Sequence, residues 1–453
     1  MKNFRGISPA LILLLTLLTV AAFVLEWIRT PEHPVLAEPP RSTDMAVIGG
    51  TAAALLTALH GAQNGAQVYL FPQGQELGED ADFLLSEGLA APLTPPQREL
   101  DEPFLPWEFE DMLRNNGGEL NDPALLTAFI QFSNQLYPML EHFNGAAFDH
   151  IPHATEKPYL HVSNLPINST AFVRRLQARV LQAGVIISDD YVKELILSPG
   201  GEITGLLLAK SGGGTEILNL PSVVLADGGY SGDPFSWHPY LPKGNLILLR
   251  PGQQGRGLRL ATEMGMDLVQ TSFYRRRLLL FSPFNEAYCL LNEQPGENAY
   301  FFNNGGQLLE WSESSEQEIL NFIHMSPPDG VYLIVIEEDI PEDCTHLFLR
   351  FADWESLARF IGGELPSFPR PYLPADVHLV SRVRVGVDYT IGGLAVTPLG
   401  QVKRKGSVVT GLFAAGEICG GLHGGAVLHG MPLSETLFFS AVVGEAAAHH
   451  AWR

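Results

Sequence analysis

The residues best suited to chemistry lie near the C-terminus, where glycines and one acid follow a short apolar run. Residues 412–415 are apolar, Gly416 and Glu417 come next, and a glycine-rich turn follows at residues 420–425. A helical pattern then begins, with Ser434 as its predicted N-cap. A strand, a glycine turn and a helix start aim backbone N–H groups and the positive end of a helix dipole at one place. The pattern therefore predicts a site for an electron-rich or anionic group.

A second glycine turn lies at the start of the globular part. Residues 46–48 form an apolar run that leads into Gly49 and Gly50, and a small-residue helical pattern continues through His60. Residues 68–71 are the next apolar run. This order of strand, glycine turn, helix and strand predicts the opening βαβ unit of a dinucleotide fold.

The dinucleotide pattern is damaged at two positions. On the G-x-G-x-x-G/A template Gly49 and Ala54 match, but Thr51 holds the middle glycine position, where a Cβ hinders the approach of a pyrophosphate. Pro72 stands where an acid usually binds the ribose hydroxyls, which leaves acids of the following loop as substitutes. By itself the segment leaves two interpretations open, a bound nucleotide and a purely structural βαβ unit.

Taken together, these turns resemble a known family. Residues 389–394 (Tyr-Thr-Ile-Gly-Gly-Leu), 411–417 and 420–424 resemble the closing motifs of the fumarate reductase/succinate dehydrogenase flavoprotein family. Residues 227–231 resemble that family's strand beside the adenosine half of FAD, with Asp227 in place of a threonine. The resemblance implies FAD as a non-covalent cofactor, and Thr51 and Pro72 predict that it binds less tightly than in members with an intact fingerprint. The residues that it assigns to FAD are Gly49, Gly50, Thr51, Ala54, Gly228, Gly229, Gly392, Gly416, Glu417, Gly421 and Ser434.

The resemblance also implies the fold class. We expect an α/β chain with a Rossmann-like FAD-binding domain of the glutathione-reductase type, interrupted by an α+β cap domain. The expected divisions are an N-terminal helix at 1–29, a proline-rich linker at 30–43, the first part of the FAD domain at 44–274, the cap at 275–383 and the closing part at 384–453. The cap sequence carries no nucleotide or metal motif.

The expected dicarboxylate site is altered in this chain. In the family, arginines and histidines bind a dicarboxylate and stabilise its developing charge, and one arginine donates a proton. The matching positions here are Arg277 and Asp388 in place of histidines, Val427 in place of an arginine and, by a loose alignment, Gln307 in place of the proton donor. The remaining catalytic candidates are therefore Arg277, Asp388 and His423.

Two interpretations of this altered site remain open. In the first, the chain is an FAD-dependent oxidoreductase that does not act on fumarate, with Arg277 holding an anionic group and Asp388 acting as a base or orienting a cation. In the second, it is a catalytically silent flavoprotein-like subunit of a membrane complex, with a structural or electron-transfer role. Each residue also has a structural interpretation: Arg277 as part of a charge run paired with the acidic cap, Asp388 as a turn residue, and His423 as packing beside the flavin.

The N-terminus predicts a membrane anchor. Lys2 and Arg5 precede residues 6–25, an uncharged stretch of about the length needed to span a bilayer. Positive charge before the span favours a cytoplasmic N-terminus and a single-pass protein of the cell membrane, with its globular part on the non-cytoplasmic side. A cleaved signal peptide, cut after residue 37, is the alternative. The anchored form predicts integral membrane or electron-transfer subunits as partners.

Composition limits the remaining classes. The chain has 28 Lys and Arg against 50 Asp and Glu, for a net charge of −22, which argues against nucleic-acid binding. Its 3 cysteines form no metal-binding or haem-attachment motif. One pair can form a disulfide if the compartment is oxidising.

Overall fold

The computed structural model describes residues 42–100, 103–144, 159–161, 168–237, 246–282, 288–291, 299–305, 307–312, 314–327, 330–335, 342–361 and 378–452. Residues 41–453 form one compact unit. The predicted N-terminal helix, and the linker as far as residue 41, lie outside the described residues. Within the described ranges, no helix combines the length and the apolar character needed to cross a membrane.

The first sheet is the parallel sheet that the sequence predicts. Its strand order is β20-β21-β9-β1-β2-β5, and β20 alone is antiparallel to its neighbour. The strands β1, β2 and β9 are buried along their whole length, which explains their continuous apolar sequences. The strands are β1 (Met45–Ile48), β2 (Val68–Phe71), β5 (Ile186–Ile187), β9 (Ser222–Leu225), β20 (Gln401–Arg404) and β21 (Ser407–Ala414).

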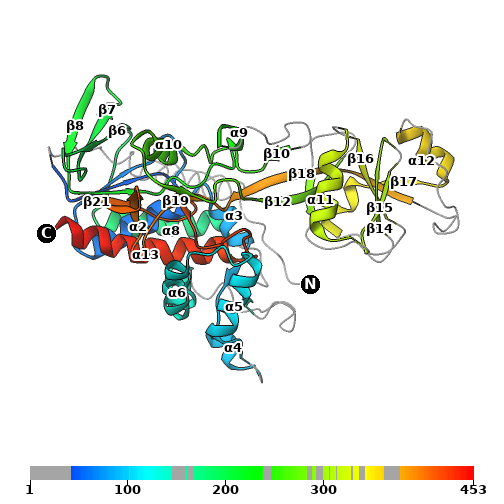
Figure 1. Cartoon of the computed structure of the whole chain (residues 1–453), viewed down its shortest axis with the longest axis horizontal. Helices are drawn as coiled ribbons and strands as arrows, with labels where there is room; N and C mark the ends of the chain where they lie inside the picture. The colour runs from blue at the N-terminus through cyan, green and yellow to red at the C-terminus, as the bar shows by residue number, and fades with distance from the viewer. Residues whose placement is uncertain are drawn as a thin grey trace, which may run out of the picture. The chain divides into compact units, whose positions relative to one another are not determined.

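Two helices from opposite ends of the described chain pack together beside this sheet. They are α2 (Ala52–Gln63) and α13 (Met431–Ala451), which lie alongside each other in Figure 1. A Cβ added to Gly444 of α13 would lie 2.6 Å from the Cβ of His60 on α2, so the glycine permits the close contact. The small residues of α2 and the C-terminal helix together bring both glycine turns of the sequence into one region.

Most strands of the second large sheet lie within residues 275–383, the range expected for the cap. Its order is β13-β12-β18-β16-β14-β15, and β10 and β17 also pair with β18. In Figure 1 β12 and β18 lie side by side along their length. The strands are β10 (Leu246–Leu248), β12 (Tyr274–Phe281), β13 (Tyr288–Leu291), β14 (Ala299–Asn303), β15 (Leu308–Glu310), β16 (Val331–Val335), β17 (Leu349–Phe351) and β18 (His378–Thr390).

A disulfide and separate apolar clusters stabilise the second sheet. Cys289 of β13 is bonded to Cys344 of the 3-10 helix η2 (Glu342–Leu347), with the two Cα atoms 5.8 Å apart. The third cysteine, Cys419, is buried and carries a thiol. The apolar clusters of this sheet are distinct from the larger cluster around the first sheet. This part of the chain therefore has a core of its own.

Smaller sheets and short helices connect these parts. The short strands are β3 (Leu89–Ala90), β4 (Leu160–His161), β6 (Tyr191–Leu197), β7 (Ile203–Ala209), β8 (Thr215–Asn219), β11 (Leu268–Val269), β19 (Gly393–Ala395) and β22 (Cys419–Gly420). The helices are α3 (Ala81–Ser86), α4 (Pro95–Arg98), α5 (Pro106–Asn116), α6 (Pro123–Phe132), η1 (Ser133–Gln135), α7 (Leu136–Asn144), α8 (Ser169–Gln182), α9 (Pro234–Trp237), α10 (Arg256–Glu263), α11 (Glu316–Met325) and α12 (Trp354–Ile361).

Two local predictions are wrong. Ser434 is not an N-cap, because α13 already begins at Met431 behind Gly430, whose φ of 81° is easily reached only by glycine. Pro432 is compatible with the first turn, where its missing N–H has no intrahelical partner to lose. Asp388 is not a turn residue either, because it lies inside β18 and is buried.

Candidate functional site

The turn before α2 is tightly packed against the end of β9. Gly49 has a φ of 133°, and a Cβ built on it would lie 2.3 Å from the Ala226 carbonyl oxygen, so only glycine fits. Thr51 is the N-cap of α2: its hydroxyl donates to the Ala226 carbonyl at 2.7 Å and accepts from the Ala54 N–H at 3.2 Å. The threonine that breaks the dinucleotide pattern therefore stabilises the turn from within the protein.

Other N–H groups of the same turn are bonded to side chains of the chain itself. The Gly50 N–H donates to Gln75 Oε1 at 2.8 Å, and the Ala52 N–H donates to Asp80 Oδ1 at 2.7 Å. The Gly78 N–H donates back to the Gly50 carbonyl at 2.6 Å. Asp80 is buried, which raises the pKa of its carboxyl, whereas the charge of Arg250 lowers it. The loop after β2 thus covers the N-terminus of α2.

A second buried acid, Asp227, follows the end of β9. Asp227 Oδ2 accepts from the Gly257 N–H at 2.6 Å and so caps the start of α10. Burial raises the pKa of Asp227 to about 6. Gly228 and Gly229 follow. A Cβ at Gly228 would meet Gln253 Oε1 at 1.7 Å, and one at Gly229 would meet side chains at 2.1 Å, so both glycines make room for neighbouring side chains.

Glu417 joins the two glycine motifs near the C-terminus. Its Oε1 accepts from the backbone N–H and from the hydroxyl of Thr390, each at 2.9 Å, and its Oε2 accepts from Arg250. The Arg250 guanidinium lies over the Phe83 ring, 4.3 Å from its centroid. Burial raises the pKa of Glu417, and the Arg250 charge lowers it in part. Glu417 is therefore one member of a buried, hydrogen-bonded charge pair.

The remaining predicted FAD-binding residues lie in close-packed turns. Gly416 packs on α2, where an added Cβ would lie 2.7 Å from the Ala53 Cβ. Gly392 lies against the backbone of residue 270, and Gly421 accepts through its carbonyl from the Asp122 N–H at 2.7 Å. The Ser434 hydroxyl donates to the Ala90 carbonyl at 2.6 Å and accepts from the Ala90 N–H at 3.1 Å.

The two catalytic candidates Arg277 and Asp388 lie together in one ion-pair cluster. Arg275 binds both oxygens of Asp388, at 2.9 and 2.8 Å, and also Glu87 at 2.7 Å. Arg277 lies 3.2 Å from Glu87 and 3.4 Å from Asp388. His429 Nδ1 lies 3.5 Å from Glu87. The arginines come from β12 and pair with carboxylates of β18 and the end of α3, so their expected pairing with an acidic cap is wrong.

The electrostatics of this cluster favour the charged forms of Glu87 and Arg275. Burial raises the pKa of Glu87, but the charges of Arg275, His429 and Arg277 outweigh that effect and hold the pKa below its usual value. Burial lowers the pKa of Arg275, but the negative charges of Asp388 and Glu87 outweigh that effect and raise it. The sequence did not indicate Glu87, and it indicated Arg275 only as part of a charge run. The run of adjacent arginines was the only sequence signal for this cluster. Nothing in the sequence shows which carboxylates these arginines meet.

A cleft of about 500 Å³ adjoins this cluster. It is bounded by β12, by the end of α5, by α11 and by the turn that follows β22. The residues that line it are Asn116, Tyr274, Arg275, Arg276, Arg277, Ser315, Leu320, Ile391, Gly425, Ala426, Val427 and His429. Val427, which stands where the family has an arginine, is therefore on its wall. Gln307 is not in the cleft but at the hairpin between β14 and β15, where it contacts Asn303.

The third catalytic candidate, His423, belongs to a separate buried group. His423 Nε2 lies 3.1 Å from Glu435 Oε2, and the Tyr389 hydroxyl donates to the same carboxylate oxygen. The His423 and Tyr389 rings meet edge to face, 5.9 Å between centroids. The other oxygen of Glu435 has no hydrogen-bond partner among the described residues. The sequence analysis did not identify Glu435. The signal that could have indicated it is an acidic residue in the first turns of an otherwise apolar helix.

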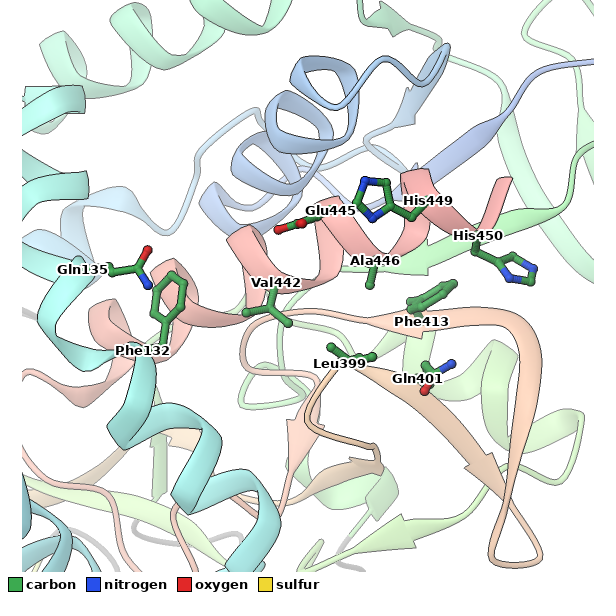
Figure 2. Close-up of a pocket in the computed structure, with 10 residues that line it drawn as sticks. All are labelled: Phe132, Gln135, Leu399, Gln401, Phe413, Val442, Glu445, Ala446, His449 and His450. Carbon is green, nitrogen blue, oxygen red and sulfur yellow. The ribbon is translucent and has the colours of Figure 1, made fainter. Parts of the chain in front are cut away.

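A second hollow lies away from all of these residues. Figure 2 shows it along α13, where Val442, Glu445 and His449 share the wall with Leu399 and Phe413 of neighbouring segments. It contains none of the predicted site residues, so the glycine turns and the ion-pair cluster lie elsewhere. No group of three or more metal-ligating side chains occurs within the described ranges.

Comparison with known proteins assigns the family. Residues 44–433 match the family described as FAD binding domain. The chain belongs to this FAD-binding family. Among curated relatives, the fumarate reductase (cytochrome) of Shewanella frigidimarina is 23% identical over 93% of this chain and 80% of its own. NADH:fumarate oxidoreductase of Klebsiella pneumoniae is 22% identical over 91% of this chain and 48% of its own.

Solved structures agree on the fold. The open conformation of a flavocytochrome c3 fumarate reductase covers 100% of this chain and 83% of its own, with a TM-score of 0.77 and 19% identity. The match to 3-ketosteroid-delta4-(5alpha)-dehydrogenase of Rhodococcus jostii RHA1 covers 92% of this chain and 99% of that enzyme, with a TM-score of 0.69 and 18% identity. The chain is a divergent FAD-binding oxidoreductase of the fumarate reductase/succinate dehydrogenase flavoprotein family, as its closing motifs predicted, and FAD is its cofactor.

The described residues fit FAD unevenly. Gly416 and Gly421 have φ values of 79° and 101°, and α13 begins behind Gly430, so the closing turns depend on glycine as the motifs predict. The turn before α2 does not accept a pyrophosphate as it stands, because Gln75 and Asp80 already bond to its N–H groups. FAD binding at this end therefore requires these two side chains to move.

Proposed function

We propose that this flavoprotein does not use a dicarboxylate as its substrate and acts instead on a substrate without negative charge. The ion-pair cluster beside the cleft carries this proposal. Arg275 and Arg277 line this cleft, and both are paired with Glu87 and Asp388. A guanidinium fork whose donors are bonded to an internal carboxylate is not available to a substrate carboxylate.

Charge balance supports the same proposal. A dicarboxylate in this cleft would come close to Glu87 and Asp388, which are both buried and both bonded to arginine. Displacing either carboxylate would break a buried ion pair, and breaking such a pair typically costs about 3–5 kcal/mol. Val427 supplies no donor in return. An uncharged ligand on this fold has a precedent in the Rhodococcus jostii structure, which is a complex of that enzyme with 4-androstene-3,17-dione.

The test is reoxidation of the reduced flavin. We expect fumarate added anaerobically to the dithionite-reduced, FAD-loaded chain to leave the flavin reduced, whereas ferricyanide reoxidises it. Each charge-assisted bond missing from a substrate clamp costs about 1.5–3 kcal/mol, and each 1.36 kcal/mol is about tenfold in rate. The Shewanella frigidimarina fumarate reductase is the positive control. Reoxidation by fumarate at a rate close to that of the control would refute the proposal.

A second candidate function is a silent flavoprotein-like subunit. The observation that favours it is the closed turn before α2, where Gln75 and Asp80 hold the N–H groups. This candidate would be supported if the chain binds FAD but the redox state of the flavin does not change with any dicarboxylate or uncharged substrate tested. Turnover of any uncharged substrate would exclude it.

We also propose that the chain is held at the cell membrane by residues 6–25, with its globular part on the non-cytoplasmic side. The supporting observation is the uncharged N-terminal stretch behind Lys2 and Arg5. Such a tether suits a subunit that meets integral membrane or electron-transfer partners. We expect the intact chain in the membrane fraction, resistant to carbonate extraction. If N-terminal mass spectrometry finds a mature chain that begins near residue 38 in the soluble fraction, the proposed membrane anchor is contradicted.

A further inference from the structure

The N-terminus of α2 already has a carboxyl group of the chain bonded to it. Asp80 Oδ1 accepts from the Ala52 N–H at 2.7 Å, and Asp80 is 6% exposed. Asp80 is also the residue before α3, so its backbone position is set by that helix. The positive end of a helix dipole stabilises a carboxylate in the same way as it stabilises a phosphate. The carboxylate and a dinucleotide phosphate therefore have the same preferred place.

Side chains around Asp80 keep the loop closed over this place. Gln75 accepts from the Gly50 N–H and donates through Nε2 to the Asp227 carbonyl at 3.0 Å and to Glu79 at 2.9 Å. Gln253 Nε2 donates to Glu79 at 3.0 Å from the loop before α10. Glutamine amides thus tie a second carboxylate, Glu79, to the loop that carries Asp80.

The charged groups of this region do not all favour an anion. Arg250 and Arg256 are the nearby cations, and both act on Glu79. Arg250 also acts on Asp80 and is bonded to Glu417, while Arg256 acts on Asp227. These two guanidinium groups thus act on four carboxyl groups, those of Glu79, Asp80, Asp227 and Glu417. A pyrophosphate would add further negative charge to carboxylates that already occupy these cations.

We propose that Asp80 is an affinity-determining residue of the cofactor site, an internal anion that competes with the pyrophosphate of FAD for the N-terminus of α2. Gln75 assists by occupying the Gly50 N–H. FAD binds by displacing both side chains, and its affinity is reduced by the free energy of the bonds that they lose. This inference concerns the phosphate end of the cofactor alone and does not depend on which substrate the cleft accepts.

The test compares two variants of full-length apoprotein that each remove one negative charge. Asp80→Asn removes the competing charge and keeps the shape of the side chain, whereas Asp82→Asn removes an equal charge from an exposed position two residues along the chain. We expect D80N to bind FAD about tenfold more tightly than wild type, or more, and D82N to stay within about twofold, as measured by quenching of flavin fluorescence. Riboflavin, which lacks phosphate, should bind all three proteins alike.

A second variant keeps the proposal falsifiable if D80N is poorly folded. Gln75 is only half-buried, and Gln75→Ala frees the Gly50 N–H without changing the charge. We expect it to tighten FAD binding by a smaller factor than D80N and to leave riboflavin binding unchanged. The proposal is overturned if neither variant binds FAD more tightly than D82N, or if riboflavin gains as much affinity as FAD.

Discussion

At the scale of single residues, the catalytic candidates of the sequence are largely partners of one another. Arg275, Arg277, Glu87 and Asp388 form a cluster in which each side chain is less than a fifth exposed. The sequence indicated Arg277 and Asp388 because the family motifs locate them. It could not indicate Glu87, which lies 188 residues from Arg275 and meets it only through the fold.

Removing one carboxylate from this cluster should destabilise the protein. Glu87→Gln leaves Arg275 and Arg277 with Asp388 as their remaining carboxylate, so we expect a loss of about 2–4 kcal/mol in the free energy of unfolding, near the range for breaking a buried pair. The measurement is urea unfolding at pH 7. Glu110→Gln, which breaks the partly exposed pair between Glu110 and Arg114, is the matched control and should cost less than about 1 kcal/mol. Equal losses in the two variants would show that the cluster is no more than a solvated charge run.

At the scale of elements, the sequence predicted the opening βαβ unit of the parallel sheet. The bounds expected for β2 agree with the structure, and those for β1 agree to within one residue, because apolar runs are local signals. The start of α13 was wrong because a left-handed glycine and a proline replaced the expected serine cap. The side-chain bonds at the α2 turn could not be predicted, because Gln75 and Asp80 reach it through a loop without periodicity.

The cap of α10 should make stability depend on pH. Asp227 has a pKa raised to about 6 by burial, so the folded state keeps its proton where the unfolded state has lost it. Its contribution is fully present below the ordinary aspartate pKa and is lost as the pH rises through about 6. The shift from 3.8 to about 6 corresponds to about 3 kcal/mol.

Asp227→Asn should remove that dependence. We expect the free energy of unfolding of the variant to vary less between pH 4 and 6 than that of wild type, by up to about 3 kcal/mol, in urea titrations at a series of pH values. Asp111→Asn, at an exposed position of α5, controls for the loss of one charge. If both variants keep the wild-type slope, the carboxyl of Asp227 is not the group that titrates.

At the scale of the whole molecule, the resemblance implies a division into an FAD domain and a cap, but it does not give the architecture of the second sheet. Its sheet is organised by β18, which pairs with β12 and β16 from distant parts of the chain. Such pairings are set by tertiary packing rather than by local sequence. The sequence also left open whether any cysteines pair, and the structure joins Cys289 to Cys344.

This disulfide links the cap to the proposed location of the protein. Disulfides persist in oxidising compartments and are rare in the cytosol, so a globular part on the non-cytoplasmic side predicts an oxidised pair in the native protein. Mass spectrometry of membranes alkylated without reduction should find a peptide that joins Cys289 to Cys344, with Cys419 alkylated only after denaturation. The pair closes a sequence separation of 55, so its removal in a Cys289→Ser, Cys344→Ser double variant should destabilise the cap by up to about 4 kcal/mol. Reduced thiols at both positions in freshly prepared membranes would contradict the proposed side of the membrane, whereas the stability of the double variant would still measure what the cross-link contributes to the fold.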